Sequence, residues 1–161
     1  MKKILFILMA AFLIFSASPV YAGPPDVAEG VWEYYIYEEY YKIAGGTTFI
    51  TTYDYGVLTG TFEGESTEVG TVVIHSNGKA SFNALLTFTG EVNGKSGTFK
   101  MSVVGRAILG EDWTGQWVIL SGTGDLANLR GEGIWYGPGA GGSFKWGTIY
   151  YEGNYHFEPG E

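Results

Sequence analysis

The feature that most constrains the fold is the two-residue alternation of apolar and polar side chains. In the segment SFNALLTFTGEV, Phe82, Ala84, Leu86 and Phe88 fall on one face, and mostly polar residues lie between them. Successive side chains of a β-strand point to opposite faces, so this period is typical of half-buried strands. No segment after residue 22 has the apolar spacing of an amphipathic helix. The chain is therefore predicted to be all-β.

Turn signals divide this pattern into antiparallel strands. Asn77-Gly78 and Asn93-Gly94 separate alternating segments, and Asn-Gly pairs readily adopt the positive φ angles of tight hairpin turns. The predicted strands are 31–41, 47–54, 57–66, 69–76, 80–91, 97–108, 112–121 and 143–157, with a short ninth at 132–136. This succession predicts a meander of hairpins.

About eight strands without helices fit either a β-sandwich or an up-and-down barrel. A barrel is favoured because closure removes exposed strand edges and because about eight strands leave room for side chains or one small ligand. Glycines inside strands are costly unless a bend or close approach requires them, as in a tightly curled barrel. Such glycines are Gly60, Gly64, Gly90, Gly105, Gly115 and Gly153. We predict a single closed antiparallel barrel, lipocalin-like in shape, with residues 23–46 as N-terminal segment and first strand and residues 47–158 as barrel domain.

The N-terminus has the pattern of a secretory signal peptide. Lys2 and Lys3 precede an apolar run over residues 4–15, and small residues occupy the cleavage positions before Ala22. The run is short for a membrane span, which needs about 20 residues, so an uncleaved anchor is the less favoured alternative. We expect residues 1–22 to be removed and the mature protein to be exported to the periplasm or the extracellular space, without membrane association.

Composition argues against several classes of function. Cleavage after Ala22 removes two of nine basic residues and none of seventeen acidic ones, and an acidic chain is unsuited to nucleic acid. The chain has no cysteine, so disulfides, thiol nucleophiles and thiolate metal sites are unavailable. With only His75 and His156 as imidazoles, a zinc site is not expected, and no metal or cofactor is predicted.

The segment SGTGDLANLRGEG interrupts the strand pattern. Gly122 to Ala127 matches the letters of a dinucleotide-binding motif, but that motif requires a following helix. Residues 125–130 leave room for one helical turn at most before the next Gly-x-Gly. A phosphate-binding loop is therefore disfavoured.

A short turn that closes one barrel end is the better hypothesis for this segment. In that arrangement Leu126 and Leu129 plug the end, and Asp125 caps the turn. Arg130 is then expected to pair with an acidic neighbour such as Glu132 or Asp125.

The same segment resembles the signature of the domain of unknown function 3224 family, close to S-G-T-G-(D/E)-L-x-x-L-R-G-x-G. The matching positions are Ser121, Gly122, Gly124, Leu126, Leu129, Arg130 and Gly131. The similarity extends upstream through GTVVIHSNGKASFNALLTFTGEVNGKSGTF and downstream to the aromatic last strand, covering about 47–157. The resemblance implies a compact barrel like that of allene oxide cyclase and dirigent proteins, without a settled function. The signal pattern, the VWEYYIYEEYYK start and the GPGAGGSF segment depart from the family pattern.

Carboxylates are the candidate catalytic groups. A carboxyl group trapped in an apolar interior has a raised pKa and can act as an acid or base, and two that meet can share a proton. Glu63 and Glu65 share a face of one predicted strand, and Asp125 and Glu132 flank the corner. The candidates are Asp125, Glu132 and Glu63, with a solvated outer face as the alternative for all three.

Aromatic side chains are more frequent than a small core needs. Trp113, Trp117, Trp135 and Tyr151 are the candidate binding residues, because tryptophan and tyrosine combine an apolar body with a polar handle that suits sugars or flat lipophilic molecules. The alternative is that they form the core and a partly wet sheet face.

The sequence thus predicts an exported β-barrel that binds a small, partly apolar ligand in its mouth or lumen. A carboxylate-dependent enzyme, either an aspartic-type peptidase or a cyclase or isomerase, is the first alternative. A structural or assembly protein, oligomeric through exposed aromatic faces, or a small outer-membrane barrel is the second, since membrane barrels share this strand pattern.

Overall fold

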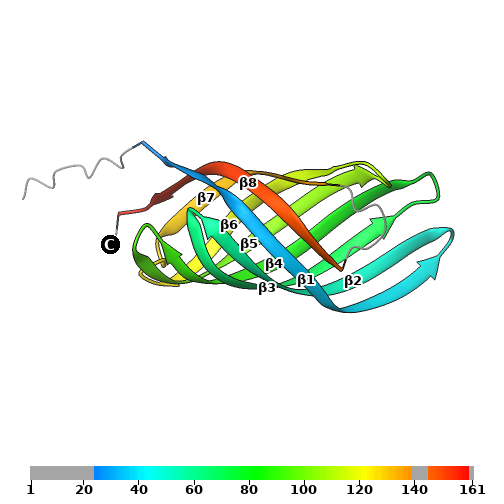
Figure 1. The fold of residues 1–161 in the computed structure, drawn as a ribbon, viewed down its shortest axis with the longest axis horizontal. Coiled ribbons are helices and arrows are strands. Elements are labelled where there is room, and N and C mark those ends of the chain that lie inside the picture. Colours follow the sequence, from blue (N-terminus) through cyan, green and yellow to red (C-terminus); the bar gives the residue numbers. More distant parts are fainter. Residues whose placement is uncertain (1–23, 139–144, 160–161) are drawn as a thin grey trace, which may run out of the picture.

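The computed structural model describes residues 24–138 and 145–159. Its strands are β1 (Asp26–Ala44), β2 (Thr47–Gly60), β3 (Phe62–Ile74), β4 (Lys79–Val92), β5 (Lys95–Ile108), β6 (Trp113–Gly124), β7 (Leu129–Gly137) and β8 (Trp146–Phe157). Each strand pairs with the next and β8 pairs with β1, so the sheet closes into a barrel (Figure 1). The predicted closed antiparallel barrel is confirmed. The predicted signal peptide, residues 1–22, and most of the GPGAGGSF segment lie outside the described residues.

Two long strands replace three of the predicted ones. The breaks expected around Gly56 and Glu68 do not occur, because β2 and β3 both run straight through these positions. The chain reverses instead at Gly60-Thr61, where Gly60 has a φ of 101° that favours glycine. The expected short strand 132–136 is the middle of β7. The barrel therefore has eight strands.

The predicted Asn-Gly turns are confirmed. Asn93 and Gly94 both have positive φ angles, 51° and 73°, and join β4 to β5. This is the pattern that a tight hairpin turn requires, and it explains why Asn and Gly stand there. Gly78, with a φ of 80°, lies in the turn between β3 and β4.

Glycines make room for large rings inside the narrow barrel. Gly105 of β5 pairs in register with Gly115 of the neighbouring strand β6. A Cβ atom at either position would overlap the indole of Trp135. The indole of Trp117 lies in the same way against Gly133 and Gly153. The glycines in these strands therefore allow the close approach that the sequence pattern suggested.

The family-like segment closes one end of the barrel. The N–H groups of Leu126 and Leu129 donate to the carbonyls of Thr123 and Leu126, at 3.2 and 3.1 Å, and form a short turn. Both leucine side chains are completely buried in the core. The predicted plug is confirmed.

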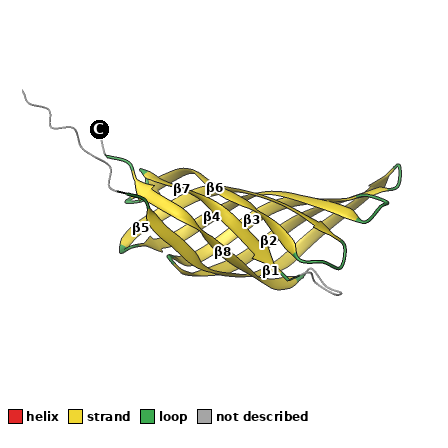
Figure 2. Cartoon of the chain, turned by 90° about the horizontal axis from the view of Figure 1, so that it is seen from above, coloured by secondary structure: helices red, strands yellow, loops and turns green. Residues whose placement is uncertain are grey.

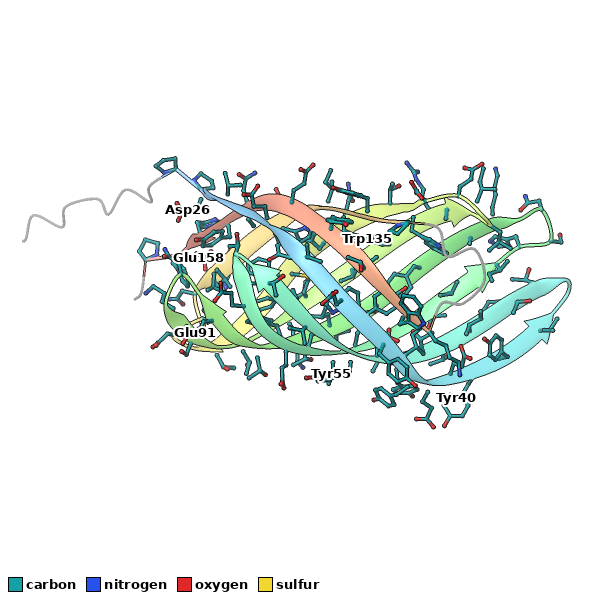
Figure 3. The ribbon with its side chains drawn as sticks, in the orientation of Figure 1. Asp26, Tyr40, Tyr55, Glu91, Trp135 and Glu158 are labelled. Carbon is teal, nitrogen blue, oxygen red and sulfur yellow. The ribbon has the colours of Figure 1, made fainter. Side chains whose placement is uncertain are left out.

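Arg130 pairs with an acidic residue, as predicted, but not with either of the two neighbours that the sequence suggested. Its guanidinium lies 2.7 Å from the Glu158 carboxylate, and not beside Glu132 or Asp125. The reason is that the Glu158 N–H donates to the Asn128 carbonyl at 2.9 Å and brings the C-terminal segment next to the turn. Figure 3 shows Glu158 at the end of the barrel where both chain ends lie.

The opposite end of the barrel is uneven. β1 pairs with β8 only as far as Tyr35, opposite Trp146, but it pairs with β2 as far as Ala44, opposite Thr47. The β1–β2 hairpin therefore projects beyond the β1–β8 seam, as the cyan hairpin in Figure 1 shows. Figure 2 shows from above that the strands at this end of the barrel extend to different lengths. No helix in the described ranges has the length and apolar character needed to cross a membrane.

Candidate functional site

The barrel encloses a cavity of about 440 Å³. This volume falls within the roughly 300–1,000 Å³ that is usual for small-molecule sites. Its lining includes Ile36, Ile50 and Trp146, which belong to the end with the projecting hairpin, and excludes the leucine plug. The cavity therefore reaches from the middle of the barrel toward the end that the leucines do not close.

The four aromatic residues predicted to bind a ligand, Trp113, Trp117, Trp135 and Tyr151, all line this cavity. The indole N–H of Trp117 donates to the Ile134 carbonyl at 3.1 Å, and that of Trp135 to the Val104 carbonyl at 3.0 Å. These bonds to the sheet fix both rings, so their apolar faces form a rigid wall. Their contact with a ligand stays a prediction.

Stacked rings form the inner end of the cavity. Phe62 stacks on Tyr151 with ring centroids 5.1 Å apart, and behind them Phe88 stacks on Phe99 at 4.4 Å. The Tyr151 hydroxyl accepts the Phe62 N–H at 3.0 Å and donates to the Thr59 carbonyl at 3.1 Å. Burial raises the pKa of Tyr151 to about 12, so its hydroxyl stays neutral. Its two hydrogen bonds link β8 to Thr59 of β2 and Phe62 of β3.

Two buried carboxyl groups lie in the cavity wall. Asp54 of β2 and Glu68 of β3 face each other in register, and both point inward, with 3 % and 2 % of their surface exposed. Asp54 Oδ2 accepts a hydrogen bond from Thr52 Oγ1 at 3.3 Å. Among the described residues, Asp54 Oδ1 and both Glu68 carboxyl oxygens have no hydrogen-bond partner. Unpartnered buried oxygens are uncommon and costly in native proteins.

Burial changes the protonation of this pair. It raises the pKa of Asp54 to about 6, although interactions with the side chains of Glu68 and Thr52 act in the opposite direction. Burial raises the pKa of Glu68 well above its usual range, and the adjacent Asp54 charge raises it further. At neutral pH the pair therefore holds one proton, on Glu68, and one negative charge, on Asp54.

Tyr34 lies beside the carboxyl pair. Burial, followed by the nearby charges of Asp54 and Glu68, raises its pKa to about 12. Its ring packs against Trp32 with centroids 5.1 Å apart, and the Trp32 indole N–H donates to Ser66 Oγ at 3.0 Å. The pair is thus flanked by a neutral phenol and an anchored indole.

The three carboxylates predicted from the sequence do not lie in the cavity. Glu63 and Glu132 are exposed on the outer faces of β3 and β7, and Asp125 is exposed in the turn that carries the plug. The expectation that one of them is the buried carboxyl group is wrong. Glu63 follows the inward-facing Phe62, so it points outward. The described residues also contain no group of three or more His, Asp or Glu that could hold a metal ion.

Asp54 and Glu68 could have been found by counting from Phe62. Residues an even number apart on one strand share a face, so the inward Phe62 places Ser66 and Glu68 inward as well. The predicted break at Glu68 interrupted this count. In β2 the outward Tyr53 is more apolar than the inward Asp54, so hydrophobicity alone indicates the wrong face.

Comparison with solved structures gives the same fold. A DUF3224-family protein of unknown function from Shewanella oneidensis MR-1 has a TM-score of 0.65 at 19 % identity, over 85 % of this chain and 100 % of that one. The pterocarpan synthase dirigent protein PsPTS1 has a TM-score of 0.52 at 14 % identity, over 87 % and 99 % of the two chains. For the pterocarpan synthase dirigent protein GePTS1 the values are 0.51 and 13 %, over 92 % and 99 %.

Comparison of the sequence with known protein families agrees with the family signature around Leu126. A search of curated proteins gives no match. The model of the family described as "Protein of unknown function (DUF3224)" matches residues 38–137, from β1 to the end of β7. This match spans more than half of the chain, so the protein belongs to the DUF3224 family, and its barrel has the dirigent-like fold.

Proposed function

We propose that this protein binds a small, largely apolar molecule with at least one flat ring in the barrel lumen. The observation that carries the proposal is the cavity of about 440 Å³ with its fixed tryptophan walls. Rings held in place before binding lose little conformational entropy when a ligand arrives, which favours affinity. Flat ligands also stack well on indole faces.

The charge of the lining narrows the ligand class. Glu39, Asp54 and Glu68 line the cavity, and its described lining contains no lysine, arginine or histidine. An anion would meet the Asp54 charge without any cationic partner in a medium that screens charge poorly. Carboxylates and phosphates are therefore disfavoured, and neutral or cationic molecules fit better.

A pair of valine variants tests the proposal. Val72 of β3 lines the cavity, whereas Val69 of the same strand lies half-exposed on the outer face. In Val72→Trp the added indole fills part of the cavity, so the uncharged, polarity-sensitive dye Prodan should bind roughly tenfold more weakly than to the wild type, or about 1.4 kcal/mol. In the control Val69→Trp, affinity should not change. Circular dichroism checks that both variants fold, and equal dye affinity in the two would contradict lumen binding.

The Asp54–Glu68 pair supports a second candidate, an acid–base enzyme. Protonated Glu68 has a proton to donate and ionised Asp54 can accept one, which suits an isomerase or cyclase. A peptidase fits less well, because a lumen plugged at one end cannot take an extended polypeptide. If a bound compound is converted, Asp54→Asn and Glu68→Gln should each abolish turnover and leave binding of Prodan intact. Unchanged turnover in both variants would remove this candidate.

The export expectation is also a proposal. It rests on the basic start, apolar run and small residues of residues 1–22. Mass measurement of the protein recovered outside the cytoplasm should give a chain that begins after Ala22. Recovery of only uncleaved chain in the cell would contradict export.

A further inference from the structure

The carboxyl pair has acceptor atoms without donors. Glu68 is almost completely buried, faces the cavity, and has neither carboxyl oxygen hydrogen-bonded among the described residues. Asp54 Oδ1 is also unpartnered there. Thr52 satisfies only the other Asp54 oxygen. A molecule that fills the cavity and brings donors to these atoms would relieve a substantial desolvation cost.

The surroundings of the pair provide no counter-charge. Tyr34 faces it from β1, Thr52 lies beside it on β2, and Leu86 of β4 stands opposite Glu68. None of these groups is cationic. At the rim of the cavity, Lys145 forms an ion pair of 3.8 Å with Glu39. Any cation that neutralises Asp54 therefore has to come with the ligand.

We infer that Asp54 and Glu68 recognise the protonated primary or secondary amine of a ligand whose ring-containing body lies against the lumen tryptophans. This inference rests on the proposed lumen binding. An ammonium group has only donors and no acceptor, which matches the negative charge of Asp54 and the carbonyl oxygen of protonated Glu68. Tyr34 and Trp32 also line the cavity, so their ring faces can add attraction for a bound cation.

The two carboxyl groups have different roles. Ionised Asp54 supplies the charge, and neutral Glu68 supplies a carbonyl oxygen as an additional acceptor. Since a cation binds to the ionised form of Asp54, affinity for an amine should be constant above about pH 7. It should fall as the pH drops through the pKa of Asp54, which is about 6. Affinity for a neutral molecule of the same shape should not fall with it.

Three probes of similar size separate charge from shape: phenethylamine, phenethyl alcohol and hydrocinnamate. Calorimetric titration of the mature protein at pH 7.5 should give the tightest binding for the amine, about tenfold tighter than for the alcohol, and the weakest for the anion. Between pH 7.5 and pH 5 the preference for the amine should decrease about tenfold, because Asp54 becomes protonated.

Isosteric variants identify the carboxyl group responsible. Asp54→Asn should remove the preference for the amine and keep binding of phenethyl alcohol, which also shows that the variant is folded. Glu68→Gln should keep most of the preference, since Glu68 is already neutral. Glu132→Gln, on the outer face, should behave like the wild type.

The outcomes separate this inference from the proposed function. Equal affinity for amine and alcohol, or a preference that survives Asp54→Asn, overturns amine recognition and leaves lumen binding standing. Absence of binding by Prodan and by all three probes overturns both. The pH series uses only the wild-type protein, so it decides the question even where a variant does not fold.

Discussion

At the residue scale, the buried carboxyl groups make stability depend on pH. The pKa of Asp54 is about 6 in the folded protein against an ordinary value of 3.8, so the native state binds more protons between these values. Stability from this group therefore falls as the pH rises from about 4 to about 6, and stays low above that. Glu68, whose pKa is also raised, acts in the same direction.

Replacing Asp54 by its amide should therefore stabilise the protein. Asparagine keeps the shape and the acceptor for Thr52 but has no charge to bury, so Asp54→Asn should raise the free energy of unfolding at pH 8 by up to about 3 kcal/mol. At pH 3 both proteins should be alike. Urea denaturation at the two pH values measures this, with Glu132→Gln as a control expected to change by less than about 0.5 kcal/mol. A variant less stable than the wild type at pH 8 would show that Asp54 is held by stronger interactions than the structure contains.

A destabilising pair of carboxyl groups in the middle of a cavity is typical of a functional site. Groups with strongly perturbed pKa values cluster at sites that bind or react. A hydrophobic pair at positions 54 and 68 would suit the apolar core better. We therefore regard Asp54 and Glu68 as the functional centre of the cavity, and the exposed Asp125, Glu132 and Glu63 as surface charges.

At the element scale, the turn of residues 125–128 closes one end of the barrel. Leu126→Ala should cost about 2–5 kcal/mol, because it leaves a cavity among completely buried side chains. Leu85→Ala, a change of the same size on the outer face of β4, should cost less than about 1 kcal/mol. Chemical denaturation of both variants gives the comparison. A similar cost at the two sites would mean that the turn does not close the core.

The same elements show how far the sequence could be interpreted. Asn93-Gly94 predicted its hairpin because both residues suit positive φ angles. The turn at Gly60 was missed because a single glycine among many carries little information. The inward-facing side of β2 holds Thr52 and Asp54, whereas Tyr53 and Tyr55 face outward. The polarity of these side chains therefore indicates the wrong face of the strand as the buried one. The barrel, the plug and the position of the tryptophans in the cavity lining were therefore predictable from the sequence. The carboxyl pair was not.

At the scale of the whole molecule, the barrel has one closed and one uneven end. The plugged end holds the densest ring packing, with Phe62 in contact with Phe88, Phe99, Trp117, Tyr151 and Tyr155. The other end has the β1–β2 hairpin, whose outer surface carries exposed tyrosines such as Tyr37 and Tyr40, both in ring contact with the outward-facing Tyr53. Figure 3 shows Tyr40 on the outside of this hairpin. We therefore expect the proposed ligand to enter from the uneven end.

This asymmetry predicts a gradient of local stability along the barrel. Residues 30–35 of β1 are paired on both sides, with β2 and β8, whereas residues 38–44 are paired with β2 alone among the described strands. Backbone groups with few neighbours open at low free-energy cost, so hydrogen exchange followed by mass spectrometry should show rapid exchange in 38–46 and slow exchange in 30–35. A bound lumen ligand should slow exchange around Ile36 and Trp146, which line the cavity, and leave the plug at Leu126 unchanged. Uniform exchange along β1, or protection at the plug alone, would place ligand entry elsewhere.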